Sequence, residues 1–292
     1  MSQQIRAYRS ASELPFSRWI KGRSGKFLMR LLPAYATRIK AAPYRQPLNA
    51  VGKLIRNGLF FKAIEDQDHS LITRFLGDYW SSPVSDEFYT GFSHRYETLF
   101  LTYHSGIVRE TLKAVEDTGN NYQQLVELGS GDGKILEHFS KELTSIPAFH
   151  GIDMNLPQTE NNRQIYSHLP TLTFHHGDAG KWLRDHASPG TVVIANGGVL
   201  EYFTRPELLE LLKFLAAKCS PCVVSLTESM AADHDLATEP ATFPYGYELS
   251  LSHNYPALLK EAGFTIHYTH DRLTTPAESD DIGRWYQVVA TA

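Results

Sequence analysis

Beyond residue 122, the apolar residues of the chain follow two different periods. Short and nearly continuous apolar runs have the length and composition of buried strands. Between them lie longer segments in which apolar residues recur every three or four positions, as on one face of a helix. The predicted strands are Gln123–Leu128, Ala148–Ile152, Thr171–His176, Thr191–Ala195, Cys222–Leu226, Phe264–His270 and Trp285–Ala290. The predicted helices are Lys134–Leu143, Thr159–His168, Gly180–His186 and Tyr255–Glu261, with one more beginning at Thr204.

The helix that begins at Thr204 has a clear start. Thr204 and Glu207 have the spacing of a capping box, and Pro206 suits the first turn of a helix. Apolar residues then recur at helical spacing, at Leu208, Leu211, Leu212 and Leu215.

Strands that alternate with helices predict an α/β fold with a doubly wound, mostly parallel sheet of seven strands. No convincing helix separates Phe264–His270 from Trp285–Ala290, so these last two strands are expected to form an antiparallel hairpin at one sheet edge. In such sheets, ligands bind beyond the carboxyl ends of the strands. The stretch Glu228–His253 has weak periodicity, which is typical of a substrate-side loop or of a surface excursion.

The two cysteines of the chain, Cys219 and Cys222, lie where the helix that begins at Thr204 is expected to end and the next strand to begin. Their spacing fits a redox pair or half of a zinc site. The sequence has no second cysteine pair to complete a four-cysteine site, so we expect both side chains to pack structurally, and we expect no metal. The low cysteine count and the lack of a secretory signal predict a cytoplasmic protein.

The first 62 residues are strongly basic, although the whole chain has a formal charge of −4. They hold 13 Lys and Arg against one acid, Glu13, which leaves 15 basic and 31 acidic residues in the rest of the chain. Three interpretations stay open. The segment is an organelle-targeting peptide, a contact surface for an anionic partner such as a membrane surface, a carrier protein or a nucleic acid, or a cap of helices that complements the acidic remainder.

Apolar residues are interleaved with these basic residues and favour helices with a buried face. They are Phe16, Trp19, Ile20, Phe27, Leu28, Leu31 and Leu32. We therefore predict that residues 1–104 form a helical cap whose basic segment packs its apolar face on the rest of the protein, and that residues 105–292 form a second domain. The end of the cap is aromatic, with Phe88, Tyr89, Phe92, Tyr96, Phe100 and Tyr103. These residues either line a ligand pocket or form the apolar face of a helix on the core.

The segment Leu125–Lys134, with the sequence LVELGSGDGK, joins the first predicted strand to the first predicted helix. Its three glycines let the backbone approach a ligand, and the amides at the helix start point toward that ligand. The glycine spacing is GxGxG, which differs from the GxGxxG of dinucleotide-binding loops. Glu127 and Asp132 would also repel a pyrophosphate, by about 1 kcal/mol or more for each close charge pair. The segment therefore favours a positively charged ligand over NAD or FAD.

These residues resemble the first motif of the class I S-adenosylmethionine-dependent methyltransferases, and the resemblance covers about residues 122–292. It implies a Rossmann-like methyltransferase core and S-adenosylmethionine as the cofactor, a ligand with a sulfonium, an ammonium and no phosphate. In that family the glycine loop lies against the methionine part of the cofactor. The resemblance assigns this contact to Glu127, Gly129, Ser130, Gly131 and Gly133.

Three further features follow the next strands in the order of that family. By resemblance, Asp153, which precedes Met154, would accept hydrogen bonds from both ribose hydroxyls. Asp178 would accept the adenine amino group, with the Ala179 amide near a ring nitrogen. Asn196 opens an Asn-Gly-Gly segment that would lie beside the sulfonium and the incoming substrate. Any one of these residues could be a helix cap or part of a tight turn, but together they favour a cofactor site.

The candidate catalytic residues are those that could act as a base toward an acceptor. A base is needed where the acceptor must lose a proton, as a hydroxyl does. We expect Glu201 and Tyr202, which follow the fourth strand, to lie on the substrate side. Tyr96 and His104 come from the aromatic end of the cap.

The implied activity is O- or N-methylation of a small-molecule metabolite. One alternative uses the same cofactor differently, as in the azetidine-2-carboxylate synthases, in which the amine attacks the γ-carbon and methylthioadenosine is released. Another alternative is a nucleic-acid or membrane-surface binding protein that uses the basic segment. Nucleic acid is disfavoured as the methyl acceptor, because the catalytic part is acidic and the Asn-Gly-Gly segment lacks the Asn-Pro-Pro-Tyr pattern of many base-modifying relatives. A membrane surface stays a possible partner, and the sequence leaves the oligomeric state open.

Overall fold

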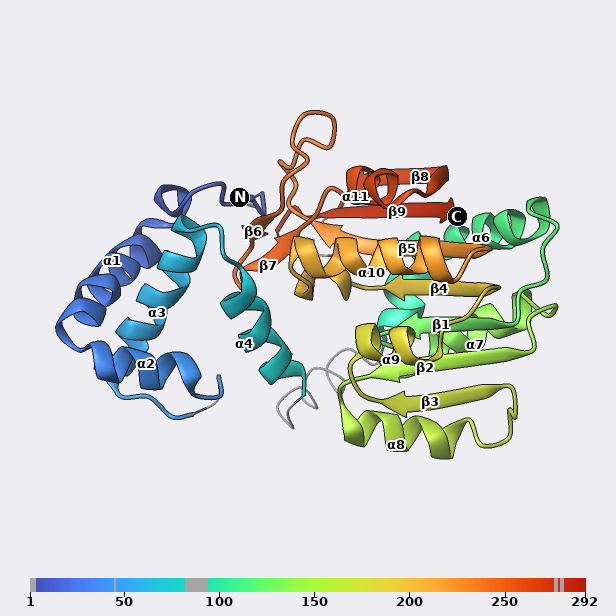
Figure 1. The fold of residues 1–292 in the computed structure, drawn as a ribbon, viewed down its shortest axis with the longest axis horizontal. Helices are drawn as coiled ribbons and strands as arrows, with labels where there is room; N and C mark the ends of the chain where they lie inside the picture. The colour runs from blue at the N-terminus through green and yellow to red at the C-terminus, as the bar shows by residue number, and fades with distance from the viewer. Residues whose placement is uncertain (1–3, 45, 82–93, 276–277, 279–280) are drawn as a thin grey trace.

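The computed structural model describes residues 4–44, 46–81, 94–275, 278 and 281–292 (Figure 1). Its centre is a seven-stranded sheet with the strand order β3-β2-β1-β4-β5-β9-β8. The strands are β1 (Gln124–Leu128), β2 (Ala148–Asp153), β3 (Leu172–His176), β4 (Thr191–Asn196), β5 (Cys222–Met230), β8 (Thr265–Leu273) and β9 (Arg284–Thr291). β1 to β5 are parallel, whereas β9 lies antiparallel between β5 and β8. The predicted doubly wound sheet and its antiparallel edge hairpin are confirmed.

Helices cover both faces of this sheet (Figure 1). The apolar residues of α9 (Ala179–His186), α10 (Arg205–Lys218) and α11 (Tyr255–Ala262) form one core cluster with one side of the strands. Those of α6 (Gly106–Asp117) and α7 (Lys134–Glu142), with Tyr166 just after α8 (Leu156–Ile165), form a second cluster with the other side. Alternate residues of a strand point to opposite faces, which is why Leu125 belongs to the second cluster and Val126 to the first.

Local sequence signals set the ends of these helices. The capping box at Thr204 forms as predicted, with the Thr204 side chain and Glu207 exchanging hydrogen bonds with each other's backbone. The α8 helix begins at Leu156, three residues before the predicted start, because the Asn155 side chain caps it by accepting from the Gln158 amide. Cys219 and Cys222 are both free and buried where α10 gives way to β5, which confirms their structural role.

The N-terminal part of the chain is helical. It contains η1 (Ala11–Glu13), α1 (Phe16–Leu31), α2 (Pro33–Ala41), α3 (Ala50–Glu65) and α4 (Ser70–Trp80). α1 packs against α3 through Gly22, Gly25 and Gly58, and a methyl group added at any of them would clash with the facing helix. The absence of side chains at these positions lets the two backbones approach closely.

The expectation that α1 would bury its apolar face is wrong. Phe16, Ile20, Phe27 and Leu31 are exposed, as is Leu32 just beyond the helix. Trp19 and Leu28 are partly buried in small clusters within the N-terminal helices. The glycines explain the difference, because α1 meets α3 through its small residues and its large apolar residues face away.

Between α4 and the sheet, the described chain continues with η2 (Tyr96–His104), a π-helix. Tyr96, Phe100 and Tyr103 of the predicted aromatic cluster lie on it, whereas Phe88, Tyr89 and Phe92 lie outside the described residues. Residues 228–253 are more ordered than predicted. β5 continues to Met230, and β6 (Phe243–Tyr245) pairs with β7 (Ser250–Ser252) in a small antiparallel sheet.

Candidate active site

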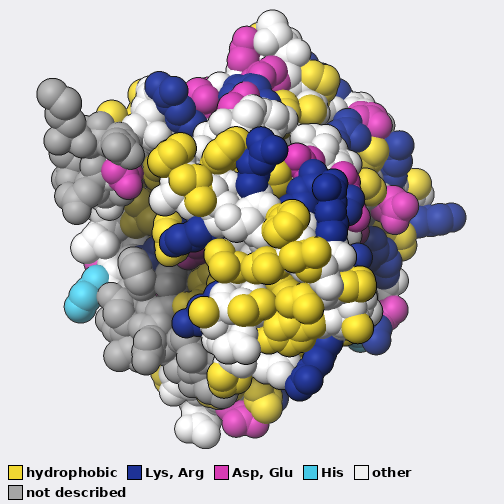
Figure 2. Space-filling view, turned by 90° about the vertical axis from the view of Figure 1, so that its left-hand side faces the viewer, with side chains coloured by type: hydrophobic (Ala, Val, Ile, Leu, Met, Phe, Trp, Pro, Cys, Tyr) yellow, Lys and Arg dark blue, Asp and Glu magenta, His cyan; other side chains and the backbone are white. Residues whose placement is uncertain are grey.

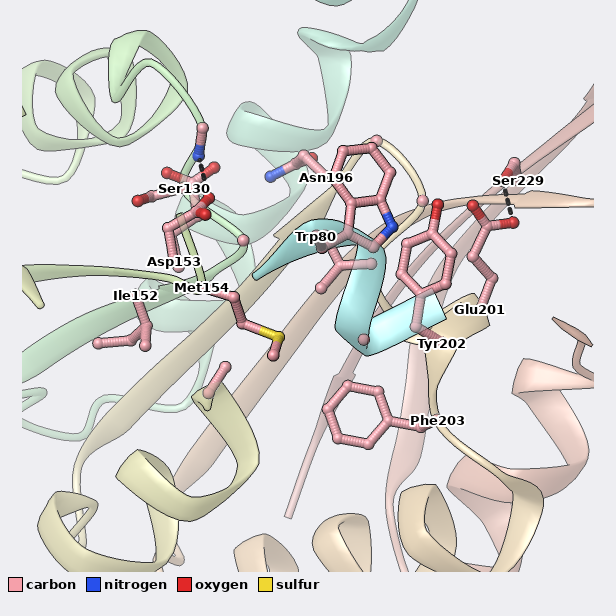
Figure 3. Close-up of a pocket in the computed structure, with 18 of the residues that line it drawn as sticks. Trp80, Ser130, Ile152, Asp153, Met154, Asn196, Glu201, Tyr202, Phe203 and Ser229 are labelled. Carbon is pink, nitrogen blue, oxygen red and sulfur yellow. Dashed lines mark hydrogen bonds between the residues drawn. The ribbon is translucent and has the colours of Figure 1, made fainter. Parts of the chain in front are cut away.

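A cavity of about 740 Å³ opens at the carboxyl ends of the central strands. Its floor comes from the ends of β1, β2 and β4 and from the loops that follow them, as expected for a doubly wound sheet. Residues of α4 and η2, from the N-terminal part of the chain, complete its wall. Residues from the N-terminal helices and from the sheet therefore line the same cavity (Figure 3).

The glycine loop after β1 forms one side of this cavity. Gly129 and Gly133 have φ values of +67° and +77°, a left-handed conformation that glycine adopts without strain. A side-chain carbon on Gly129 would also lie 2.6 Å from the Val199 Cγ2 atom. Asp153, at the end of β2, fixes the loop, because its Oδ2 atom accepts a hydrogen bond of 2.9 Å from the Gly131 amide. Glycine is therefore required at Gly129 and Gly133 for both conformation and space.

Glu127 lies beneath this loop with only 1 % of its surface exposed. Its Oε2 atom has no hydrogen-bond partner among the described residues. Burial raises the pKa of this carboxyl well above its usual value, and the charges of Asp132 and Asp153 raise it further. A buried carboxylate with an unsatisfied oxygen is costly unless a positive group or a donor reaches it. The site therefore suits a cationic ligand.

The other predicted cofactor residues surround the same cavity. Ser130 belongs to the loop, and Met154 follows β2. The two carboxylate oxygens of Asp153 each accept one backbone amide, from Gly131 and from Asn155. Asp153 lines the cavity, and a carboxylate is a group that can accept hydrogen bonds from two hydroxyls.

Asp178 and Ala179 line the cavity at the start of α9. The Asp178 side chain caps this helix, with its Oδ1 atom accepting the Lys181 amide at 2.6 Å. The capping role that the sequence left open therefore occurs in the structure. Capping uses one carboxylate oxygen and leaves Asp178 on the cavity wall.

Asn196 ends β4 and is almost fully buried at the cavity. Neither its Nδ2 nor its Oδ1 atom has a hydrogen-bond partner within the described part of the chain. The next two residues, Gly197 and Gly198, have φ values of +98° and +83°. They turn the chain back so that Glu201 sits beside Gly198, where an added side-chain carbon would be 2.7 Å from the Glu201 Oε1 atom. A buried amide with both polar atoms unsatisfied marks a place where a ligand would bind.

Glu201 is a buried carboxyl on the opposite side of the cavity from the glycine loop. In Figure 3, Asn196 and Trp80 lie between Ser130 and Asp153 on one side and Glu201 and Ser229 on the other. The Glu201 Oε2 atom accepts hydrogen bonds from the hydroxyls of Ser229, at 2.9 Å, and of Tyr245. Burial raises the pKa of Glu201 to about 7, although these hydrogen bonds oppose the shift. Glu201 therefore has a pKa suited to a base that works near neutral pH.

The short helix that carries Glu201, η3 (Leu200–Tyr202), is fixed by another buried carboxyl. The Glu228 Oε2 atom accepts the backbone amides of Val199, at 3.0 Å, and Leu200, at 2.9 Å. Burial and the nearby Glu201 raise the pKa of Glu228 to about 8. Glu228 thus positions the segment that holds Glu201.

Tyr202 faces Trp80 of α4, with ring centroids 5.6 Å apart and planes tilted by 54° (Figure 3). Burial raises the pKa of Tyr202 well above its usual value, so its hydroxyl stays protonated at neutral pH. Arg95 also lines this region, and burial lowers its pKa while the neighbouring Tyr202 and Glu201 raise it. The protonated hydroxyl of Tyr202 can donate a hydrogen bond at neutral pH.

The two other base candidates line the cavity but have unfavourable surroundings. The Tyr96 hydroxyl lies 2.9 Å from His138 Nδ1, and burial raises its pKa. The His104 Nε2 atom lies 2.9 Å from Arg272 Nη2, and its ring packs on Trp285. Burial, with the charge of Arg272, lowers the pKa of His104 to about 3. A group of such low basicity is a poor proton acceptor, so the surroundings of His104 favour Glu201 over His104 as the base.

Sequence reasoning did not find several residues of this cavity. Trp80 and Arg95 had no motif around them, and only their arrangement in space shows their place. Tyr245 lies within Glu228–His253, the stretch for which a substrate-side loop was one of two interpretations. Its hydrogen bond to Glu201, and the position of Glu248 on the cavity wall, favour the substrate-side interpretation.

Comparison with known proteins gives the fold. A SAM-dependent methyltransferase from Leishmania major is 12 % identical, with a TM-score of 0.50 over 74 % of this chain and 82 % of that protein. Magnesium protoporphyrin IX methyltransferase from Synechocystis PCC 6803 with bound SAM is 16 % identical, with a TM-score of 0.47 over 75 % of this chain and 96 % of that protein. No protein-family model matches the sequence, and no curated protein matches it. The methyltransferase fold expected from the resemblance is confirmed by the Leishmania major structure.

Proposed function

We propose that the chain is an S-adenosylmethionine-dependent methyltransferase that acts on a small-molecule metabolite. The observation that carries the proposal is the unpaired, buried carboxylate oxygen of Glu127 beneath the glycine loop. A ligand with an ammonium and a sulfonium would offset the cost of that charge, whereas a pyrophosphate would increase it. The methyltransferase fold is the second support. In this proposal, residues 105–292 are the catalytic domain and residues 1–104 are the cap.

The residues around the cavity divide between binding and chemistry. When bound, S-adenosylmethionine supplies an electrophilic methyl carbon on its sulfonium. Glu127, Gly129, Ser130, Gly131 and Gly133 would hold the methionine part of the cofactor. Asp153 and Met154 would hold the ribose, and Asp178 and Ala179 the adenine. Asn196, with both polar atoms unsatisfied, would lie between the cofactor and the acceptor.

Glu201 is the residue that we assign as the base. Its pKa of about 7 leaves an accepting carboxylate at and above neutral pH. Ser229 and Tyr245 hold its Oε2 atom, and Tyr202 lines the cavity next to it. As the acceptor's lone pair forms the new bond to carbon, its proton would pass to Glu201, and the electrons of the broken carbon–sulfur bond would stay on sulfur.

A small acceptor suits this site better than a nucleic acid. The cavity volume lies within the range of about 300–1,000 Å³ that is typical of small-molecule sites. Residues of α4 and η2 contribute to its wall and limit the access of a polymer. Beyond residue 62 the chain also has 31 acidic against 15 basic residues, which is unfavourable for binding phosphates there.

A second reaction, cyclisation of the cofactor itself, is favoured by one observation. Glu201 and the aromatic rings of Trp80, Tyr202 and Phe203 line the same cavity, so the site offers both a base and faces that stabilise a cation. In that reaction the amine nitrogen forms a bond to the γ-carbon, the bond from that carbon to sulfur breaks, and methylthioadenosine leaves. The amine proton would pass to Glu201.

Product analysis separates the two reactions. Purified protein is incubated with S-adenosylmethionine alone and with a desalted metabolite extract, and the products are quantified by mass spectrometry. We expect no turnover of the cofactor alone and formation of adenosylhomocysteine when the extract is added. Steady release of methylthioadenosine with a cyclic amino acid from the cofactor alone would overturn methyl transfer. Boiled protein serves as the control for spontaneous breakdown.

A further inference from the structure

The α1 helix presents a stripe of large apolar side chains to solvent. Phe16 is 75 % exposed, Ile20 42 %, Phe27 59 % and Leu31 60 %. The spacings of four, seven and four residues place these side chains on one face of the helix. Figure 2 shows apolar side chains gathered on this end of the molecule, with Lys and Arg side chains around them. We call Phe16, Ile20, Phe27 and Leu31 the α1 stripe.

The architecture of α1 fixes the direction of this stripe. Gly22 and Gly25 lie on the opposite face of the helix, where Gly22 meets the Phe61 side chain of α3 and Gly25 meets the α3 backbone at Leu54 and Gly58. Since this face is filled by the contact with α3, α1 cannot rotate to bury its stripe without losing the close packing of the glycines. The exposure of the stripe is thus built into the helix contact.

Positive charge surrounds the stripe. Between Glu13 and Glu65 the chain has 11 Lys and Arg and no Asp or Glu. Lys21, Arg23 and Arg30 of α1 are exposed and flank the stripe on both sides, since they lie about a third of a turn or less from its edges. Arg38 and Lys40 of α2 are exposed as well. The combination of apolar side chains and flanking cations on one helix is typical of a helix that lies in a lipid interface.

We propose that the α1 stripe docks the protein on the surface of an anionic lipid membrane. The helix would lie in the plane of the interface, with the stripe inserted among the acyl chains and the flanking cations against the headgroups. Its 16 residues give it a length of about 24 Å, enough for a single anchor of this kind. Among the residues that the structure describes, no helix has the length and apolar character to cross a membrane.

Two other partners fit the observations less well. A nucleic acid would attract the cations, but it offers no apolar surface to cover two Phe, one Ile and one Leu side chain. A second copy of this chain would bury the apolar stripe, but it would also bring the flanking Lys and Arg residues of the two copies against each other without acids between them. An anionic lipid surface satisfies both the apolar stripe and the cations.

Vesicle flotation with the full-length protein tests the proposal. We expect binding to vesicles of phosphatidylcholine with about one-third phosphatidylserine, and much weaker binding to vesicles of phosphatidylcholine alone. Phe27→Gln with Leu31→Gln should lower the partition coefficient on anionic vesicles by about tenfold or more, because it removes two inserted side chains. The matched control is Ile165→Gln, which changes an exposed apolar residue at the end of α8 and should leave binding unchanged.

Four results would overturn the proposal, and the first three concern vesicles and the oligomeric state. These are no binding to anionic vesicles at physiological salt, equal binding by the stripe variant and the wild type, or a wild-type dimer in light scattering that the stripe variant abolishes. Tight binding of an oligonucleotide by wild type and stripe variant alike, without vesicle binding, would also contradict it. Thermal unfolding of both variants checks that they fold, which the exposed positions of all three side chains lead us to expect. The test is independent of the proposed methyl transfer, because vesicle binding requires no cofactor or acceptor.

Discussion

Glu201 and Glu127 are both buried carboxyls at the cavity, but their surroundings give them different roles. Glu201 is held by two hydroxyl donors, whereas an oxygen of Glu127 has no partner among the described residues. Glu201 can therefore exchange a proton within a fixed frame, and Glu127 requires a bound charge or donor. The sequence located both residues but did not distinguish their environments, because Ser229 and Tyr245 reach Glu201 only through the folding of β5 and β6.

The pKa of Glu201 predicts how the rate depends on pH. Burial raises it to about 7, so below that pH the carboxyl is protonated and cannot accept the acceptor's proton. Once an acceptor has been identified, kcat/KM for that acceptor should fall about tenfold per pH unit below pH 7. Glu201→Gln should lower kcat by about 10²–10⁴-fold. It should also abolish the fall of kcat/KM below pH 7, which we call the acidic limb of the pH profile.

The control for this prediction is Glu248→Gln. Glu248 is also a cavity residue whose pKa is raised by burial, and its variant should keep the acidic limb. An unchanged limb in Glu201→Gln, measured from adenosylhomocysteine formation across pH 5.5–9, would show that another group is the base.

At the scale of elements, the sequence predicted helices and strands wherever a local signal existed. The capping box at Thr204 and the strand runs gave the bounds of α10 and the strands to within a few residues. The β6–β7 hairpin was missed because its strands are three residues long, too short for a period to be visible. The outward face of α1 was missed for another reason. An amphipathic pattern identifies the apolar face of a helix, but it does not indicate what covers that face.

The contact of α1 with α3 is the element-scale feature that mutation tests best. Gly25→Ala would place a methyl group against the backbone of Leu54 and Gly58, and overpacking of this kind costs about 1–3 kcal/mol. We expect it to lower the free energy of unfolding of the N-terminal helices by that amount, measured by amide exchange in α1 and α3.

Gly106→Ala is the matched control for the helix contact. An added methyl group there meets no atom within 4 Å, at the start of α6. It should be neutral or stabilise the protein by up to about 1 kcal/mol, since alanine favours a helix more than glycine does. Equal effects of the two substitutions would mean that the close contact between α1 and α3 does not matter for stability.

In the whole molecule, a cavity at the carboxyl ends of the central strands has its wall completed by residues of α4 and η2. The doubly wound sheet followed from the alternation of strands and helices, and the four motifs at strand ends predicted that the candidate cofactor residues would meet at one cavity. The contribution of Trp80 and Arg95 did not follow from the sequence, because contacts between distant segments leave no local pattern. Side chains from α4, η2, η3 and the β6–β7 hairpin also line the cavity together, and no local sequence pattern predicts that combination.

The proposal that the cavity binds S-adenosylmethionine is tested by calorimetric titration of the purified protein with S-adenosylmethionine and, separately, with NAD. We predict a one-to-one complex with S-adenosylmethionine and no binding of NAD. Glu127→Gln should weaken the complex by about 1–3 kcal/mol, because it removes the buried charge that faces the ligand, and Asp153→Ala should weaken it by a similar amount through its lost charge-assisted hydrogen bonds. Glu137→Gln, in α7 outside the cavity lining and paired with Lys141, should leave it unchanged. Binding of NAD without binding of S-adenosylmethionine would contradict the proposed cofactor site.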